Sequence, residues 1–358
     1  MSSVGERVAL GALLATGIAV ISVEAEAAEN AAGWYALGTK ASMAGFVPPP
    51  GTYFIDVNMF YEGTASAASA VGVALQDISP AARKLNLKGE LLVEAKADVT
   101  GKVYYNLPSV LWVAPQKVLG GNVAFGAIVP FGSKDVDFDL DALTTLKLGP
   151  PINQTFQRGQ HFSEGDSSTD FGDPVFNALI GWHQGNWHWN VGMLVNVPIG
   201  PWSNTSSSNL SFNHWGLDTT AAVTWLDPKT GVEVSAAPGF TFNSENPDTD
   251  YRTGTEFHVE FAVLEHFSQK FALGIAGYHY QQVTGDSGPG ARLGDFKGRV
   301  TSVGPVMTYN FNLGKIPVSS QLMWTHDFDV ENRLKGDLGL LTISFPLSGS
   351  SPAPADLE

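Results

Sequence analysis

The sequence predicts an all-β fold, a transmembrane antiparallel β-barrel with an N-terminal segment inside the lumen, and three observations lead to this prediction. From residue 52 onward, apolar and polar residues alternate with a period of two, which places them on opposite faces of strands. Many of these stretches extend over about 10 to 12 residues, enough for a tilted strand to cross the hydrocarbon layer. The connections between them alternate between short and long, as in outer-membrane barrels.

Residues 1–28 have the pattern of a secretory signal peptide. Arg7 precedes an uncharged, mostly apolar stretch from Val8 to Val23, and Ala25-Glu26-Ala27 then supplies a small-x-small cleavage pattern. A transmembrane anchor is the alternative, but the stretch is slightly short for a helical span. We therefore expect export, with the mature protein in the outer membrane of a Gram-negative bacterium.

The composition excludes several classes of function. The chain has no cysteine, so neither a disulfide framework nor a thiolate metal site can form. The formal net charge is −15, which argues against nucleic acid as a partner because phosphate binding needs basic patches. Only 15% of residues are charged, against about 25% in soluble domains. The expected partners are the outer-membrane bilayer with its lipopolysaccharide, and a small-molecule solute.

Residues 29–51 precede the first predicted strand and are expected to plug or narrow the lumen. A Pro-Pro-Pro run cannot donate to a β-ladder and favours a stiff extended chain. A disordered periplasmic tail is the alternative, but such tails are usually more polar. The expected plug residues are Trp34, Tyr35, Met43, Phe46, Pro48, Pro49 and Pro50.

The barrel itself is predicted over residues 52–347, followed by a flexible tail at 348–358. The clearest alternation covers 53–61, 187–197, 232–242, 257–263 and 303–311. If 86–115 and 121–145 are unbroken strands, the barrel has twelve strands, which is the favoured prediction. Breaks near Gly101 and Gly132 would give fourteen. Both numbers are even, so both termini are expected in the periplasm.

The connections predict which end of the barrel faces the periplasm. Short turns are expected on the periplasmic side at 184–186, 227–231, 268–270 and 314–317. Residues 115–120 form a further periplasmic turn if the barrel has twelve strands. Aromatic residues such as Trp187 and Trp225 flank these turns, which is typical of an interfacial girdle. Long external loops are expected at 147–172, 199–215, 244–254 and 285–297.

The faces that alternate with the apolar ones are polar or glycine-rich, which favours a barrel over the alternative of a soluble sandwich. These faces are expected to line the lumen. The expected lining residues are Asp56, Asn58, Glu62, Lys88, Glu90, Glu94, Lys96, Asp98, His258 and Glu260. Four aspartates from Asp135 to Asp141 share one strand face and are expected to be hydrated or paired.

The sequence gives little support to an enzyme. It contains no Gly-x-Ser-x-Gly elbow, HExxH motif, phosphate loop or dinucleotide fingerprint. No catalytic residue, metal or cofactor is therefore expected. Two alternatives to a channel remain. One is a lipid-acting outer-membrane enzyme with a serine activated by histidine. The other is a surface barrel with an adhesive or structural role.

Longer motifs point to a family. The chain contains Gly33 to Gly38, Val47 to Phe54, Leu111 to Pro115, Val118 to Gly121, Gly172 to Pro174, Gly181 to His183, Trp225 to Gly231, Glu245 to Tyr251, Tyr278 to Gln282 and Arg292 to Phe296. Together these motifs resemble the SphA-like outer-membrane proteins, often called phenol meta-pathway degradation proteins, over residues 30–347. The resemblance implies a twelve-stranded barrel with its N-terminal segment in the lumen. It also implies a channel or transporter for hydrophobic or aromatic compounds, with no enzymatic step.

Overall fold

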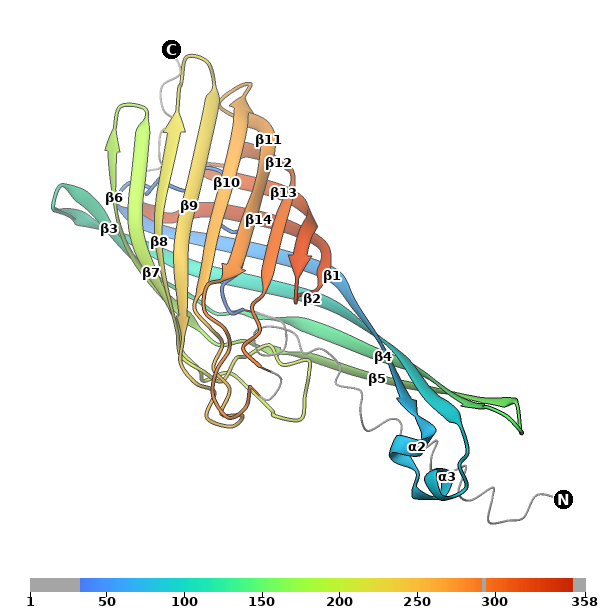
Figure 1. Ribbon diagram of the computed structural model, residues 1–358. Helices are drawn as coiled ribbons and strands as arrows, with labels where there is room; N and C mark the ends of the chain where they lie inside the picture. Colours follow the sequence, from blue (N-terminus) through green and yellow to red (C-terminus); the bar gives the residue numbers. More distant parts are fainter. Residues whose placement is uncertain (1–32, 292–293, 350–358) are drawn as a thin grey trace. The chain divides into compact units, whose positions relative to one another are not determined.

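A computed structural model describes residues 33–291 and 294–349 (Figure 1). The expected signal peptide and residues 350–358 of the expected tail lie outside the described residues. The chain divides into two compact units. Of the described residues, the barrel unit comprises 33–63, 101–136, 166–291 and 294–349, and the four-strand unit comprises 64–100 and 137–165.

Fourteen strands and two short helices follow one another along the described chain. They are β1 (Gly51–Ala74), α2 (Leu75–Ile78), α3 (Pro80–Lys84), β2 (Gly89–Val118), β3 (Gly121–Ile128), β4 (Phe131–Leu148), β5 (Gln154–Phe171), β6 (Val175–Gln184), β7 (Trp187–Asn196), β8 (Gly216–Leu226), β9 (Val232–Asn243), β10 (Glu256–His266), β11 (Phe271–Gln282), β12 (Arg299–Leu313), β13 (Ile316–Glu331) and β14 (Lys335–Gly349). Among the described residues, no helix has the length and apolar character needed to cross a membrane.

The strands form one sheet that closes on itself. Its order is β1-β14-β13-β12-β11-β10-β9-β8-β7-β6-β3-β2-β4-β5, and β1 also pairs with β2. The pairing of β1 with both β14 and β2 therefore closes a ring of twelve strands, which confirms the predicted barrel. The strands β4 and β5 are additional and follow β2 in the sheet.

One detail of the predicted strands is corrected and another is confirmed. The expected long loop at 147–172 is instead a short connection followed by β5, because residues Gln154–Phe171 form an 18-residue strand. Nearly all side chains of β5 are exposed and most are polar, so its sequence shows no alternation. The stretch 86–115 is a single strand, β2, as the twelve-strand prediction required.

Prolines explain where the other predicted strand is interrupted. The stretch 121–145 is unbroken in the favoured prediction, but the structure interrupts it at Val129 and Pro130, close to the Gly132 break of the fourteen-strand alternative. Proline has no N–H to donate to the ladder, so Pro130 contributes only its carbonyl, which accepts a hydrogen bond from Gly172 N at 2.9 Å. Val129 N donates in turn to the carbonyl of Pro108 on β2 at 3.1 Å.

The barrel wall has a polar buried face and an apolar exposed face. On β9, Glu233, Ser235 and Thr241 are buried, whereas Val234 and Phe240 are exposed. The continuous antiparallel register between β9 and β10 places Phe240 opposite Phe257, and their rings lie 5.2 Å apart. A soluble sandwich would bury its apolar faces instead, so the structure excludes that alternative.

Three apolar clusters lie among the described residues. In the barrel unit, one includes Ala41, Leu264, Tyr278, Met323 and Leu340, and another includes Val47, Tyr53, Leu111, Val113 and Ala124. The third lies in the four-strand unit and includes Leu75, Ala82, Leu91 and Leu146. Because Ala41 and Val47 precede β1, residues before the first strand contribute to both clusters of the barrel unit.

Candidate functional site: the N-terminal segment on the polar wall

The candidate site joins two parts of the barrel unit. We call residues 33–50 the N-terminal segment, and we call the buried polar face of β6 to β10 the polar wall. Side chains along these strands alternate, so every second residue of β8, β9 and β10 points to this face. Buried polar groups need hydrogen-bond partners, and the N-terminal segment supplies many of them.

Asp218 and His258 form the centre of the polar wall. His258 Nε2 lies 2.8 Å from Asp218 Oδ2, and both side chains are almost completely buried. The same carboxylate accepts hydrogen bonds from Thr220 Oγ1 at 2.6 Å and from Thr241 Oγ1 at 2.8 Å. The Tyr35 ring of the N-terminal segment stacks on the His258 imidazole, with ring centroids 3.9 Å apart.

Glu260 holds the first half of the N-terminal segment. One carboxylate oxygen accepts a hydrogen bond from the Tyr35 hydroxyl. The other accepts a hydrogen bond from the backbone N–H of Lys40 at 2.6 Å. The Glu260 side chain is buried, so these donors replace the water that an ionised carboxylate would otherwise bind.

Glu233 holds the second half in the same way. Its carboxylate accepts hydrogen bonds from Met43 N at 2.7 Å and from Ser42 Oγ at 3.0 Å. On the wall side, His266 Nε2 lies 2.7 Å from the same carboxylate. Glu233 is fully buried, so two buried carboxylates, 27 positions apart in sequence, hold one short segment.

Further hydrogen bonds extend the contact to both ends of the strands. Trp34 Nε1 donates to Asn243 Oδ1, at the end of β9, at 3.0 Å. Asn190 Nδ2 donates to the Ala44 carbonyl at 2.9 Å, and His183 Nε2 lies 3.0 Å from the Val47 carbonyl. The segment therefore follows β9 from its last residue, Asn243, to Glu233 near its start.

Gly45 allows the closest approach of the two parts. Its backbone N–H donates to Thr224 Oγ1 at 2.9 Å. A Cβ at this position would lie 2.3 Å from the His188 carbonyl oxygen and 2.5 Å from Thr224 N. Only glycine fits between these backbone atoms, which are part of the paired strands β7 and β8.

The predicted plug residues differ in their contacts. Trp34 and Tyr35 are buried, and Met43 binds Glu233 through its backbone. The Phe46 ring lies 5.1 Å from His183 and 5.4 Å from His188. The carbonyl of Pro49 accepts a hydrogen bond from the Tyr53 hydroxyl. Pro48 is half-buried and Pro50 is exposed.

The predicted lining residues fall into two groups. In the barrel unit, His258 and Glu260 belong to the polar wall, and Asn58 accepts a hydrogen bond from the Tyr104 hydroxyl at 2.8 Å. Asp56 accepts one from Asn106, and Glu62 forms a surface ion pair with Lys102. The other five lie in the four-strand unit, where most are exposed: Lys88, Glu90, Glu94, Lys96 and Asp98.

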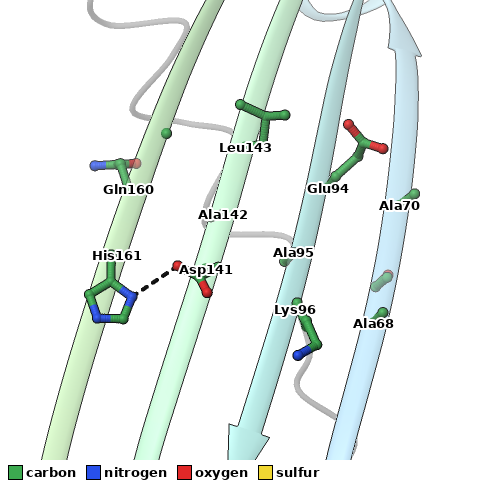
Figure 2. Close-up of a pocket in the computed structure, with 12 residues that line it drawn as sticks. Ala68, Ala70, Glu94, Ala95, Lys96, Asp141, Ala142, Leu143, Gln160 and His161 are labelled. Carbon is green, nitrogen blue, oxygen red and sulfur yellow. Dashed lines mark hydrogen bonds and ion pairs between the residues drawn. The ribbon is translucent and has the colours of Figure 1, made fainter.

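Glu94 and Lys96 help to line a shallow pocket of the four-strand unit (Figure 2). Small side chains such as Ala68 and Ala70 line one side of it. His161 Nδ1 lies 2.9 Å from Asp141 Oδ1, and His161 Nε2 lies 3.9 Å from Asp139 Oδ1, so two of the four aspartates of β4 contact this histidine. Within the described residues, no group of three or more His, Asp or Glu side chains could hold a metal ion.

The predicted site lacks six wall residues that hold the segment or its partners, namely His183, Asn190, Asp218, Thr224, Glu233 and Asn243. Glu233 stands between Val232 and Val234 in a clear alternating stretch. The period of two was therefore the signal that could have identified it. Two of the partners within the segment, Lys40 N and Met43 N, are backbone groups, which no side-chain pattern shows.

A closed ring of twelve antiparallel strands, apolar outside and polar on its buried face, defines an outer-membrane β-barrel. A family model described as "Putative MetA-pathway of phenol degradation" matches residues 79–343. The chain belongs to this family, which confirms the resemblance seen in its motifs. No curated protein matches the chain.

Several solved structures match the chain at low sequence identity, and the first of them is similar in fold. The COG4313 outer membrane channel from Pseudomonas putida F1 is 16% identical, with a TM-score of 0.59, and the match covers 85% of this chain and 98% of that one. A Pseudomonas aeruginosa FadL homologue is 9% identical over 83% of this chain and 90% of that one, with a TM-score of 0.38. The CymD monoaromatic hydrocarbon channel is 9% identical over 86% and 90%, with a TM-score of 0.33.

Proposed function

We propose that the protein is an outer-membrane channel for the passive uptake of small hydrophobic or aromatic molecules, and that the N-terminal segment narrows its lumen. The observation that carries the proposal is the binding of this segment along the polar wall, through Glu260 and Glu233. A closed barrel that only anchored a surface structure would not need a segment bound along its buried face.

The family and the fold support the solute class and the route. The family description refers to phenol degradation, and phenol is a small aromatic molecule that must cross the outer membrane before it is degraded. The similar Pseudomonas putida structure is described as an outer membrane channel. His258 is bound to Asp218 and stacked on Tyr35, so its contacts suit the positioning of the segment better than the activation of a nucleophile.

Solute uptake tests the proposed function. The purified mature protein, reconstituted in liposomes, should make them permeable to small aromatic solutes such as benzyl alcohol and benzoate, measured by swelling. Protein-free liposomes give the background. Swelling no faster than this background, by a correctly folded sample, would reject the channel. Release of fatty acid from phospholipid by the same sample would favour the lipid-acting enzyme.

Deletion of residues 29–48 tests the narrowing of the lumen. Removal of the segment should raise single-channel conductance in planar bilayers, because the carboxylates of the polar wall then face water instead of Tyr35, Lys40 and Met43. A matched control is Glu265→Gln, since Glu265 lies at the end of β10 and is only half-buried. Equal conductance of the deletion variant and the full mature chain would reject the narrowing role.

A further inference from the structure

A second cluster in the barrel unit, separate from the contacts of the N-terminal segment with Glu260 and Glu233, centres on Arg333. This residue lies in the short connection between β13 and β14. Its guanidinium carbon lies 4.3 Å from the centre of the Tyr280 ring, which is the geometry of a cation–π contact. Tyr280 is near the end of β11 and is almost completely buried.

The Arg333 side chain is held in place by packing rather than by ion pairing. A Cβ on Gly298 would lie 3.1 Å from Arg333 Cγ and 3.2 Å from Cδ, so the aliphatic part of the side chain passes close to the Gly298 backbone. Placement of the guanidinium over Tyr280 is thereby fixed before any ligand arrives. Such preorganisation reduces the entropy lost on binding.

One nitrogen of the guanidinium nevertheless lacks an acceptor. Its Nη1 atom is buried and has no hydrogen-bond partner, and Arg333 forms no ion pair within the part of the chain that the structure describes. Arg299, at the start of β12, also has a buried nitrogen without a hydrogen bond, Nε, but it differs from Arg333 in forming ion pairs. It pairs with Asp329 at 3.4 Å and with Glu331 at 3.3 Å. A buried donor without an acceptor is costly, so an anionic acceptor would be stabilising at Nη1 of Arg333.

The nearest carboxylates already have other donors. Glu256 accepts a hydrogen bond from the Tyr280 hydroxyl at 2.6 Å. Asp327 accepts hydrogen bonds from the hydroxyls of Tyr278 and Tyr61, both at 3.1 Å. The three tyrosines therefore bind the acidic groups through their hydroxyls. Glu256, Tyr61 and Tyr278 also lie within electrostatic range of the Arg333 charge.

We infer that Arg333 and the three tyrosines form a binding site for an aromatic carboxylate. The planar guanidinium can donate two parallel hydrogen bonds to a carboxylate, and tyrosine rings can stack on a planar aromatic ring. This inference rests on the proposed function, because it names the class of solute that the channel would select. A neutral hydrocarbon would leave the buried donor unpaired and would gain only the stacking.

Direct binding tests this site without any transport step. Benzoate is titrated into the full-length mature protein in detergent at pH 7 by calorimetry, with benzyl alcohol as the neutral analogue of the same ring. Benzoate should bind at least about tenfold more tightly than benzyl alcohol. The variant Arg333→Gln should lose this preference, Arg333→Lys should keep part of it, and the control Arg299→Gln should leave it unchanged.

The outcomes separate this inference from the proposed channel. Equal binding of benzoate and benzyl alcohol, or unchanged benzoate binding by Arg333→Gln, would overturn the site even if liposomes become permeable. Benzoate binding that depends on Arg333 in a protein that does not permeabilise liposomes would support the site and reject the channel. A heat-dependent shift in gel mobility shows that each variant is folded before it is titrated.

Discussion

Glu260 and Glu233 link the N-terminal segment to the polar wall through hydrogen bonds to backbone N–H groups. Both side chains are 0% exposed. A buried carboxylate needs donors that compensate for lost hydration, and Lys40 N and Met43 N provide them at 2.6 and 2.7 Å. Because two of the four donors from the segment are backbone groups, the binding depends on the course of the segment as well as on the Tyr35 and Ser42 side chains.

At the residue scale, Glu260→Ala is expected to loosen the segment. The substitution leaves the Tyr35 hydroxyl and Lys40 N without their acceptor, and each charge-assisted hydrogen bond contributes about 1.5–3 kcal/mol. The midpoint of urea unfolding in lipid vesicles should fall, and channel conductance should rise. Glu265→Gln, on the same strand, serves as the control. An unchanged conductance with a lowered unfolding midpoint would show that Glu260 stabilises the barrel without controlling the passage.

The alternation of apolar and polar side chains along a strand predicted part of the site. His258 and Glu260 stand on the polar side of an alternating stretch, and both belong to the polar wall. Lys96 and Glu94 alternate with apolar residues in the same way, but they line a pocket of the four-strand unit. A period of two shows which residues share a face and does not show which part of the fold that face belongs to.

At the scale of an element, the turn between β8 and β9 is held by Asp227. Its carboxylate accepts hydrogen bonds from Thr230 Oγ1 at 2.8 Å and from Lys229 N at 3.2 Å. These hydrogen bonds hold the pKa of Asp227 below its ordinary value, and the bond from the Thr230 hydroxyl contributes most. Gly231 follows with a φ of 78°, a left-handed conformation that favours glycine.

Thr230→Val is therefore expected to raise the pKa of Asp227 toward its ordinary value. A carboxyl group whose pKa is lowered by folding stabilises the protein above its unfolded pKa and loses that contribution as the pH falls through the folded pKa. The variant should thus show a smaller loss of stability between neutral and acidic pH, measured by urea unfolding. In an Asp227→Asn background, Thr230→Val should change this pH dependence no further. A further change would show that another group is responsible.

The predicted elements agree with the structure where one face is apolar. The strands β7, β9, β10 and β12 were predicted by their alternation, and each is present. In contrast, β5 was predicted as a loop because both of its faces are exposed and largely polar. Its backbone pairing with β4 satisfies the strand hydrogen bonds whatever the side chains are. Hydrophobic patterning therefore could not identify it.

At the scale of the whole molecule, the exposed apolar face of the barrel wall needs a lipid environment. Val263 on β10 lies opposite Ile275 on β11, and these side chains are 50% and 58% exposed. Phe240, Phe242 and Leu273 are also exposed. Contiguous apolar surface of this kind is rare on soluble monomers, whereas an outer-membrane barrel presents it as a band toward acyl chains.

Ile275→Arg tests this orientation. Near the middle of a membrane strand, arginine on the lipid face is expected to cost about 2–4 kcal/mol, measured by urea unfolding in lipid vesicles. Leu85→Arg is the matched control, because Leu85 is 69% exposed but follows α3 in the four-strand unit. A surface substitution there should change stability by no more than about 0.5 kcal/mol. Similar small effects at both positions would contradict a lipid-facing wall.

The order of the chain sets a sequence of events for assembly. Hydrogen bonds of the N-terminal segment join positions that lie 136 to 225 residues apart, and every wall residue involved is synthesised after the segment itself. Closing such long loops is entropically costly and slow. Until β10 has reached the membrane, Tyr35 and Lys40 have no Glu260 to bind. The N-terminal segment therefore lacks these hydrogen-bond partners until more than half of the chain has been synthesised after it.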